Sequence, residues 1–247
     1  MDRLVDMARL GLRGAMVRQT AVANNLANAN TTGFRAEILN AQSRWIDGNT
    51  LRSRAMPTDQ VIAADMKAGT VTTTGNPLDV AISGDGLLAV QANDGSEGYT
   101  RRGDLMLSDS GLLTTSDGYP VMGEGGPITL PPADKITIGS DGSISIVPAG
   151  GDPNQPQQID RLKVVSPKGS AIAKGTDNLF RQANGGTLPS DPLAQVIQGS
   201  LEGSNVNATS SLIDMIEASR GWQGQVKLIE TAKDIDSSGA SLMRLDG

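Results

Sequence analysis

The stretch ANNLANANTTGF, residues 23–34, lies where a helical pattern ends and an extended pattern begins. Asparagine weakens a helix because its side chain competes for backbone hydrogen bonds, and Gly33 can take the left-handed backbone position that ends a helix. One interpretation is that the asparagines only terminate the helix. In a second, which we favour, their amides hydrogen-bond to neighbouring subunits and fix the register between apolar helix surfaces.

Helical patterns lie before this stretch and at the far end of the chain. In both, apolar or small residues recur in a 3,4 alternation that puts them on one helix face. In the second, Ile213, Ile216 and Ile235 widen the apolar surface enough to touch more than one neighbour. The patterns predict terminal helices that pair as a coiled coil, with a lone amphipathic helix as the alternative. The seam residues are Val5, Leu12, Val22, Leu212, Met215, Trp222, Val226 and Ile229.

Both predicted helices contain glycine, namely Gly11 and Gly14 in the first and Gly221 and Gly224 in the second. Each glycine costs about 1 kcal/mol relative to alanine in a helix interior. Helices without tertiary support are already marginal. We therefore expect the termini to be partly disordered in the free subunit and to fold when packed, with the glycines permitting close helix approach.

Short strand-like runs separated by Asp-Gly pairs fill the middle of the chain, and Asp-Gly is a strong signal for a tight turn. They predict a compact all-β domain. The expected fold class is α+β, and its parts are an N-terminal helix with the Asn-rich segment (1–34), an extended or hairpin connector (35–70), the all-β domain (71–192) and a C-terminal helix (193–247).

The Asp-Gly pairs are better explained by turns than by calcium binding, because no complete calcium loop with a closing Glu is present. The glycine-rich segment 123–126 is not followed by the Lys-Ser/Thr pair of a phosphate-binding loop, and no helical pattern begins there. We therefore predict no metal site and no cofactor.

Composition excludes several classes of protein. The chain has no His and no Cys, which rules out a His base, a Cys nucleophile, a thiolate zinc site and a disulfide. A net charge of −6 argues against a general nucleic-acid binder. Ser, Asp and Lys are plentiful, but no spacing singles out a catalytic site, so we expect no enzyme. A secreted β-domain enzyme or binding module remains the alternative class.

The N-terminus does not resemble a secretory signal, because Asp6 and Arg9 interrupt any apolar stretch of about 7 residues. No later segment approaches the roughly 20 apolar residues that span a bilayer. We expect a protein that is cytoplasmic, or exported without a cleaved signal peptide.

Sequence signatures lie at both ends and in the middle of the chain, in the segments 23–34, 78–86, 99–103, 126–128, 199–207, 215–218 and 229–232. They resemble, in the same order, those of the bacterial flagellar rod and hook family of axial proteins. Total length and the opening residues most resemble the proximal-rod members, with distal-rod members as the alternative. Two departures are Leu87-Leu88, where the family usually has two phenylalanines, and the two C-terminal glycines, where alanine is expected.

This resemblance implies a structural subunit of the basal-body rod, exported through the flagellar type III apparatus and assembled helically into a periplasmic drive shaft that transmits torque. Its partners would be copies of itself and other rod subunits, with no direct membrane insertion. The terminal helices would form an inner coiled-coil layer and the β domain an outer one. The residues expected to contact neighbouring subunits are Asn24, Asn25, Leu26, Asn28, Asn30, Thr31, Gly33 and Phe34.

Overall fold

The structure is a computed structural model that describes residues 2–45 and 55–245, with side chains described for 9–38, 63–235, 237 and 238. Its fold is α+β, as the sequence predicts: two long terminal helices accompany many short antiparallel strands. The chain divides into two compact units. The helical unit holds Met1–Ala27, Glu37–Ala63 and Asn207–Gly247, and the β unit holds Asn28–Ala36 and Ala64–Val206.

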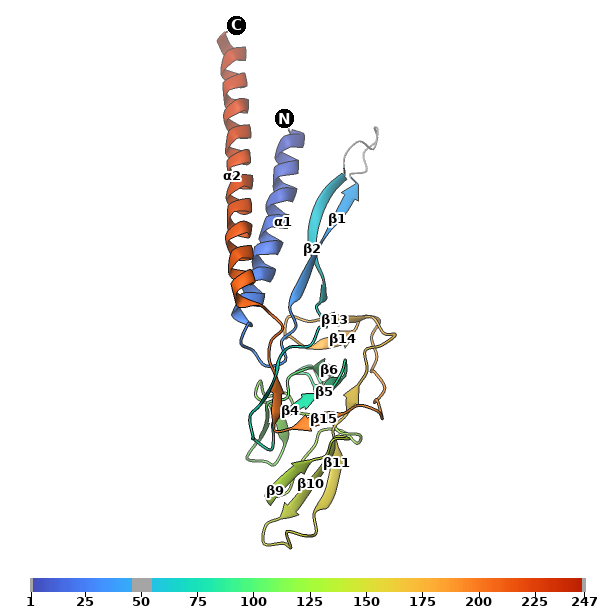
Figure 1. The fold of residues 1–247 in the computed structure, drawn as a ribbon. Coiled ribbons are helices and arrows are strands. Elements are labelled where there is room, and N and C mark those ends of the chain that lie inside the picture. The colour runs from blue at the N-terminus through green and yellow to red at the C-terminus, as the bar shows by residue number, and fades with distance from the viewer. Residues whose placement is uncertain (1, 46–54, 246–247) are drawn as a thin grey trace. The chain divides into compact units, whose positions relative to one another are not determined.

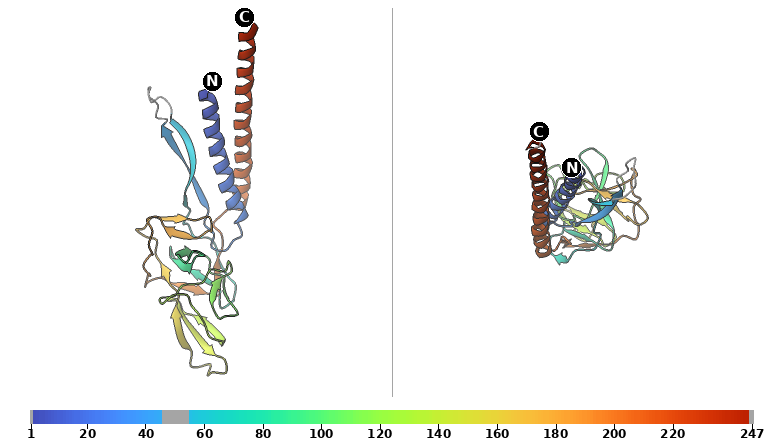
Figure 2. Two further views of the ribbon diagram at one scale, coloured as in Figure 1. Left: turned by 180° about the vertical axis from the view of Figure 1, so that it is seen from behind. Right: turned by 90° about the horizontal axis from the view of Figure 1, so that it is seen from above.

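In the helical unit, α1 (Asp2–Ala27) and α2 (Ala208–Leu245) lie side by side and run in opposite directions (Figures 1 and 2). The strands β1 (Glu37–Trp45) and β2 (Ala55–Ala64) pair as a two-stranded sheet, and β1 contacts α1. The connector therefore contains a pair of strands, and residues 46–54 between them lie outside the described residues.

Helix α2 begins at a polar cap. Asn207 Oδ1 accepts a hydrogen bond from Ser210 N at 3.1 Å, and Asn207 O accepts one from Ser211 N at 2.9 Å. A side chain in this position satisfies one of the backbone amides that the first turn leaves without a partner. Asn207, directly before the first residue of α2, is therefore the N-cap of this helix.

The β unit consists of several small sheets. Its largest sheet has the strand order β12-β5-β6-β14-β13, a second has the order β11-β10-β9, and three pairs are β15-β4, β16-β3 and β7-β8. The strands are β3 (Val71–Thr73), β4 (Val80–Ile82), β5 (Leu87–Gln91), β6 (Glu97–Thr100), β7 (Leu105–Leu107), β8 (Leu113–Thr115), β9 (Ala133–Ile138), β10 (Ser143–Pro148), β11 (Gln157–Arg161), β12 (Val164–Val165), β13 (Ile172–Lys174), β14 (Phe180–Gln182), β15 (Val196–Gln198) and β16 (Ser200–Glu202).

The two leucines of β5 connect the main cores of the β unit. Leu88 belongs to a large aliphatic cluster with Val80 and Ile82, whereas Leu87 belongs to a second cluster with Tyr99. Successive side chains of a strand point to opposite faces, so one strand can serve two cores. Both leucines are completely buried. The departure from the family's two phenylalanines therefore leaves no exposed apolar surface at this strand.

Two Asp-Gly-Ser turns have the same geometry. Asp94 Oδ1 accepts hydrogen bonds from Ser96 N at 2.9 Å and Ser96 Oγ at 2.6 Å, and Asp141 Oδ1 does the same with Ser143 at 3.1 and 2.7 Å. The serine hydroxyls, followed by the serine amides, lower the pKa of both aspartates. Within 2–45 and 55–245, no group of three or more acidic side chains could hold a metal ion. The Asp-Gly pairs at 94–95 and 141–142 thus serve as turns.

Candidate assembly surfaces

The two terminal helices approach closely where α1 carries a glycine. A Cβ atom added to Gly11 would lie 2.7 Å from Gln225 Oε1, so any larger residue would displace that side chain. On α2, Gln225 belongs to a heptad series with Ser211, Ala218 and Ala232, which are buried. We call these four residues the inner face of α2. Small side chains on such a face let two helix axes come close together.

The predicted seam of α1 is turned largely inward. Leu12 is partly buried and Val22 is buried, as are Gly14 and Ala21. The side chain of Val5 lies outside those described.

The predicted seam of α2 is divided between covered and exposed positions. Leu212 is 52% exposed and Trp222 is 38% exposed. The inner face follows 211, 218, 225 and 232, so the covered side is turned by about one residue from the predicted seam. The partly buried members of that seam are Met215, Val226 and Ile229.

Apolar side chains on α2 also remain uncovered. Large apolar residues that are about half exposed, repeated along one helix, form far more apolar surface than single scattered residues do. The exposed members are Leu212, Ile213, Ile216, Trp222, Leu228 and Ile235. Pairing with α1 therefore covers only part of the apolar surface of α2.

At the end of α1, two asparagines bind the start of β1. Asn25 Nδ2 donates to Glu37 O at 3.0 Å, and Asn25 Oδ1 accepts from Glu37 N at 2.8 Å, so the amide makes a two-way contact with the backbone. Asn24 Nδ2 donates to Glu37 Oε1 at 2.5 Å, and Leu26 beside them is partly buried. These contacts are all within one chain and hold the helix end against the strand.

The next residues form two successive turns in the β unit. Thr31 N and Thr31 Oγ1 donate to Asn28 O and Asn28 Oδ1, both at 3.1 Å, while Asn30 is exposed. Gly33 N then donates to Glu202 O at 2.7 Å. Gly33 has φ +66°, and an added Cβ would lie 2.4 Å from Arg101 O. Only glycine fits this position.

Directly after this turn, three buried charges join segments that are far apart in the sequence. Glu202 Oε1 lies 2.6 Å from Arg35 Nη1 and accepts a hydrogen bond from Gly69 N at 2.7 Å, while Oε2 accepts from Arg101 Nε at 2.9 Å. Arg35, Arg101 and Glu202 are each at most 3% exposed. A buried charge is tolerated only where it is paired and hydrogen-bonded. We call these three residues the Arg–Glu cluster.

The arginines of the cluster also bind backbone carbonyls. Arg35 Nη1 donates to Lys67 O at 2.6 Å, and Arg101 donates to Gly86 O at 2.6 Å and Ile82 O at 2.9 Å. Burial lowers the pKa of Arg101, Glu202 opposes that shift, and the neighbouring Arg35 adds to it. The cluster thus cross-links the segment after the Asn-rich stretch, the β3–β5 region and β16.

Asn205 makes a second link between the same segments. Its Oδ1 accepts a hydrogen bond from Ala36 N at 2.7 Å, and its Nδ2 donates to Asp65 O at 2.8 Å and Lys67 O at 2.9 Å. Nearby, Lys174 Nζ lies 3.6 Å from the centre of the Phe34 ring, which is buried. The C-terminal signature at 199–207 therefore holds the N-terminal signature in place within one chain.

Sequence reasoning included Arg101 and Glu202 in signatures, left Arg35 just outside one, and gave none of these charges a role. Arg35 follows Gly33-Phe34 directly, and Glu202 stands inside a glycine- and serine-rich run. The available signal was a charged residue within or beside a sequence signature of a turn or strand that is expected to be buried. Which arginine would meet which carboxylate could not be read from it.

The chain is similar to known proteins both in separate segments and over its whole length. Family models match three segments: "Flagella basal body rod protein" at 8–35, "Flagellar hook protein FlgE/F/G D1 domain" at 81–146, and "Flagellar basal body rod FlgEFG protein C-terminal" at 197–242. The flagellar basal-body rod protein FlgF of Salmonella typhimurium is 39% identical over 251 residues, covering 99% of this chain and 100% of that one. The chain belongs to the flagellar basal-body rod protein family. The matched N- and C-terminal segments contain most of each helix, Arg35 and the whole of β16.

Other relatives support the same membership. FlgF of Escherichia coli is 40% identical over 240 residues, 95% of each chain, and the rod protein FlgG of Bacillus subtilis is 34% identical over 248 residues, 91% of this chain and 93% of that one. The two FlgF proteins match this rod protein at higher identity than FlgG does. It is a basal-body rod protein most like FlgF of the proximal rod.

Membership of a structural family confirms the prediction that this rod protein is not an enzyme, and it implies assembly with other rod subunits. Its location is the rod of the flagellar basal body. In the part of the chain that the structure describes, neither helix combines the length and the apolar character that crossing a membrane requires.

Proposed function

We propose that this rod protein assembles with copies of itself and with other rod subunits through its terminal helices, and that the resulting shaft transmits torque. The observation that carries the proposal is the apolar surface that pairing with α1 leaves uncovered on α2. Ile213, Ile216 and Leu228 are each more than half exposed. Burying such side chains against a neighbour stabilises association by about 25 cal/mol for each Å² of apolar surface removed from water.

The Asn-rich segment contributes a polar contact between subunits in this proposal. Asn30 is exposed and Thr31 is partly buried, so these two can reach a neighbour directly. Asn25, Gly33 and Phe34 support them from within the chain, because their internal contacts fix the course of the backbone. The remaining members of the predicted contact set are Asn24, Leu26 and Asn28.

The chain is exported through the flagellar type III apparatus without a cleaved signal peptide. A strain that lacks a functional flagellar export apparatus should retain the full-length chain inside the cell. Release of the chain from such a strain in normal amounts would contradict this part of the proposal.

Deletion of the gene tests the assembly role most directly. Basal bodies imaged from the deletion strain should lack an intact rod, and the cells should not swim. An intact rod with normal motility would overturn the proposal.

A pair of substitutions tests whether the helices carry the assembly. Ile229→Asp places a charge at a partly buried position of α2, so we expect loss of motility when this variant replaces the parent chain. Gln223→Asp places the same charge at an exposed position of the same helix and should preserve motility. Helix content measured by circular dichroism distinguishes failed folding from failed assembly. Equal motility of the two strains would contradict a role for the helix surface.

A further inference from the structure

We infer that α2 carries a second helix-binding stripe, separate from its inner face, and that α1 of a second copy of this chain occupies it. The inference rests on the proposed assembly through terminal helices and names its surface and its partner. The stripe consists of Ile213, Glu217, Gly221, Gly224, Leu228, Thr231 and Ile235, which we call the outer stripe.

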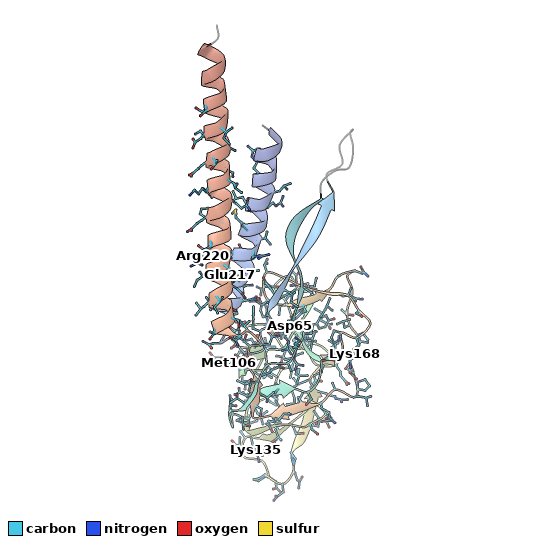
Figure 3. All side chains as sticks on the ribbon, turned by 45° about the horizontal axis from the view of Figure 1, so that its top comes forward. Asp65, Met106, Lys135, Lys168, Glu217 and Arg220 are labelled. Atoms are coloured by element: carbon cyan, nitrogen blue, oxygen red, sulfur yellow. The ribbon has the colours of Figure 1, made fainter. Side chains whose placement is uncertain are left out.

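Spacing along α2 defines the outer stripe. Its members follow one another at intervals of four or three residues, which keeps them on one side of a helix. At about 100° per residue, they lie roughly 100° around the axis from the inner face. All seven are exposed, and Ile213, Leu228 and Ile235 are each more than half exposed. Figure 3 labels Glu217, the one charged member.

The glycines of the outer stripe differ from Gly11 of α1 in what surrounds them. A Cβ added to Gly221 or Gly224 would meet nothing within 4 Å, whereas one added to Gly11 would collide with Gln225. The close contact between α1 and α2 thus explains Gly11 but neither glycine of α2. Each of these costs about 1 kcal/mol of helix stability relative to alanine. Together they leave a shallow hollow between the apolar residues of the stripe.

Helix α1 carries a matching outward stripe. Arg9, Arg13, Met16, Thr20 and Ala27 are exposed and follow the same four-and-three spacing, with Ala23 completing the series. Met16 is 55% exposed and is long and flexible enough to fill a hollow between glycines. The outward stripe spans about 27 Å and the outer stripe about 33 Å at 1.5 Å per residue, so the two agree in length.

Charge favours α1 over a second α2 as the occupant. Helix α1 contains four arginines and two aspartates, and Arg13 stands on its outward stripe. The outer stripe carries one charged residue, the acidic Glu217. Over its whole length α2 has five acidic and four basic residues, so α1, with its net positive charge, is attracted to α2, whereas a second α2 carries net charge of the same sign. The same two helices already pair in opposite directions within one chain, so the second contact continues an existing one.

Substitution of the two glycines gives a test in which helix stability and assembly change in opposite directions. Replacing Gly221 and Gly224 by alanine should raise the thermal stability of the isolated chain, because alanine favours a helix. It should lower the association constant of the chain, measured by sedimentation, at least tenfold, because the new methyl groups fill the hollow. Gln223→Ala changes an exposed residue outside the stripe and should leave association unchanged. Unchanged association in the double variant would overturn the stripe.

Cross-linking identifies the occupant. Because the chain has no Cys, Thr20→Cys on one copy and Glu217→Cys on another introduce the only thiols, and both positions are exposed and lie outside the hollow. In basal bodies from a strain that makes these two single variants together, mild oxidation should join copies into a species of doubled mass on a non-reducing gel, whereas a strain that makes either variant alone should give at least tenfold less. Thr20→Cys made together with Gln223→Cys is the matched control and should likewise give at least tenfold less.

The outcomes separate this inference from the proposed function. Intact, motile rods in which the Thr20/Glu217 pair cross-links no better than the control would overturn the outer stripe and leave the rod function standing. Intact, motile rods that contain none of the chain would overturn the proposed function itself.

Discussion

In the β unit, three charged side chains are almost completely buried and paired with one another, whereas in the helical unit the large apolar side chains of α2 stand about half exposed. The β unit pairs these buried charges within one chain. The helical unit leaves apolar side chains of α2 exposed, although they could be buried at little cost. This difference indicates that conformational stability comes mainly from the β unit and that association depends on the helical unit.

Glu202→Gln tests the stability of the β unit and has the largest expected effect. Removal of its charge leaves Arg35 and Arg101 buried without a carboxylate, and breaking a buried ion pair costs about 3–5 kcal/mol. Urea unfolding should record this loss. Glu124→Gln, at an exposed position, should change the free energy of unfolding by less than about 0.5 kcal/mol. Similar stability of the two variants would show that the Arg–Glu cluster is not what holds the β unit.

Gly33→Ala should have the next largest effect. The position has φ +66° and an added Cβ would lie 2.4 Å from Arg101 O, so we expect a loss of about 1–3 kcal/mol. Gly125→Ala provides the control, because an added Cβ there meets nothing within 4 Å. Thermal unfolding compares them, and a Gly33→Ala variant as stable as the control would mean that the turn can relax.

Alkaline pH should weaken the β unit through Tyr99. Burial raises the pKa of this phenol to about 12, with Glu97 adding to the shift, while the hydrogen bond from Leu188 N opposes it. The unfolded phenol titrates near 10, so the stabilisation is complete below about pH 10 and is lost as pH rises through about 12. We expect a decline of about 1–2 kcal/mol over that range. Tyr99→Phe should remove this part of the pH dependence, and an unchanged slope would contradict the assignment.

The smallest effect on stability is expected on the helix surface. Ile216→Ser changes an exposed residue of α2 and should alter the free energy of unfolding by less than about 0.5 kcal/mol. The same change should nevertheless reduce motility in complemented cells, because it removes apolar surface needed for association. Thr129→Ser, an exposed position of the β unit, should affect neither property. Normal motility with Ile216→Ser would weaken the division of roles between the two units.

The helices and the strands could be predicted because local patterns encode them. The 3,4 alternation predicted both terminal helices, and Asp94-Gly95 and Asp141-Gly142 predicted turns that the structure confirms. The side of α2 that α1 covers was harder to predict. Ser211, Ala218 and Ala232 are small, so an apolar pattern gave them less weight than Leu212 and Trp222.

The internal role of the two signatures could not be read from spacing. Glu202 meets Arg35 and Arg101 only because β16 pairs with β3 and brings its carboxylate to both guanidinium groups. Such pairing depends on the whole sheet arrangement rather than on neighbours in the sequence. The proposed contacts with other subunits stay a prediction, because a single chain contains only one of the two surfaces that form each contact.

The Arg–Glu cluster also sets the order in which the chain can fold. Arg35 and Arg101 leave the ribosome long before Glu202, which follows Arg35 by most of the length of the chain. Until that carboxylate arrives, closing the β unit would bury two cations with no counter-charge, and the loop that must close is long. In a growing chain, the β unit therefore stays open until Glu202, in the last quarter of the chain, has been made. This delay suits the export proposed above, in which the chain passes through the flagellar apparatus before it folds.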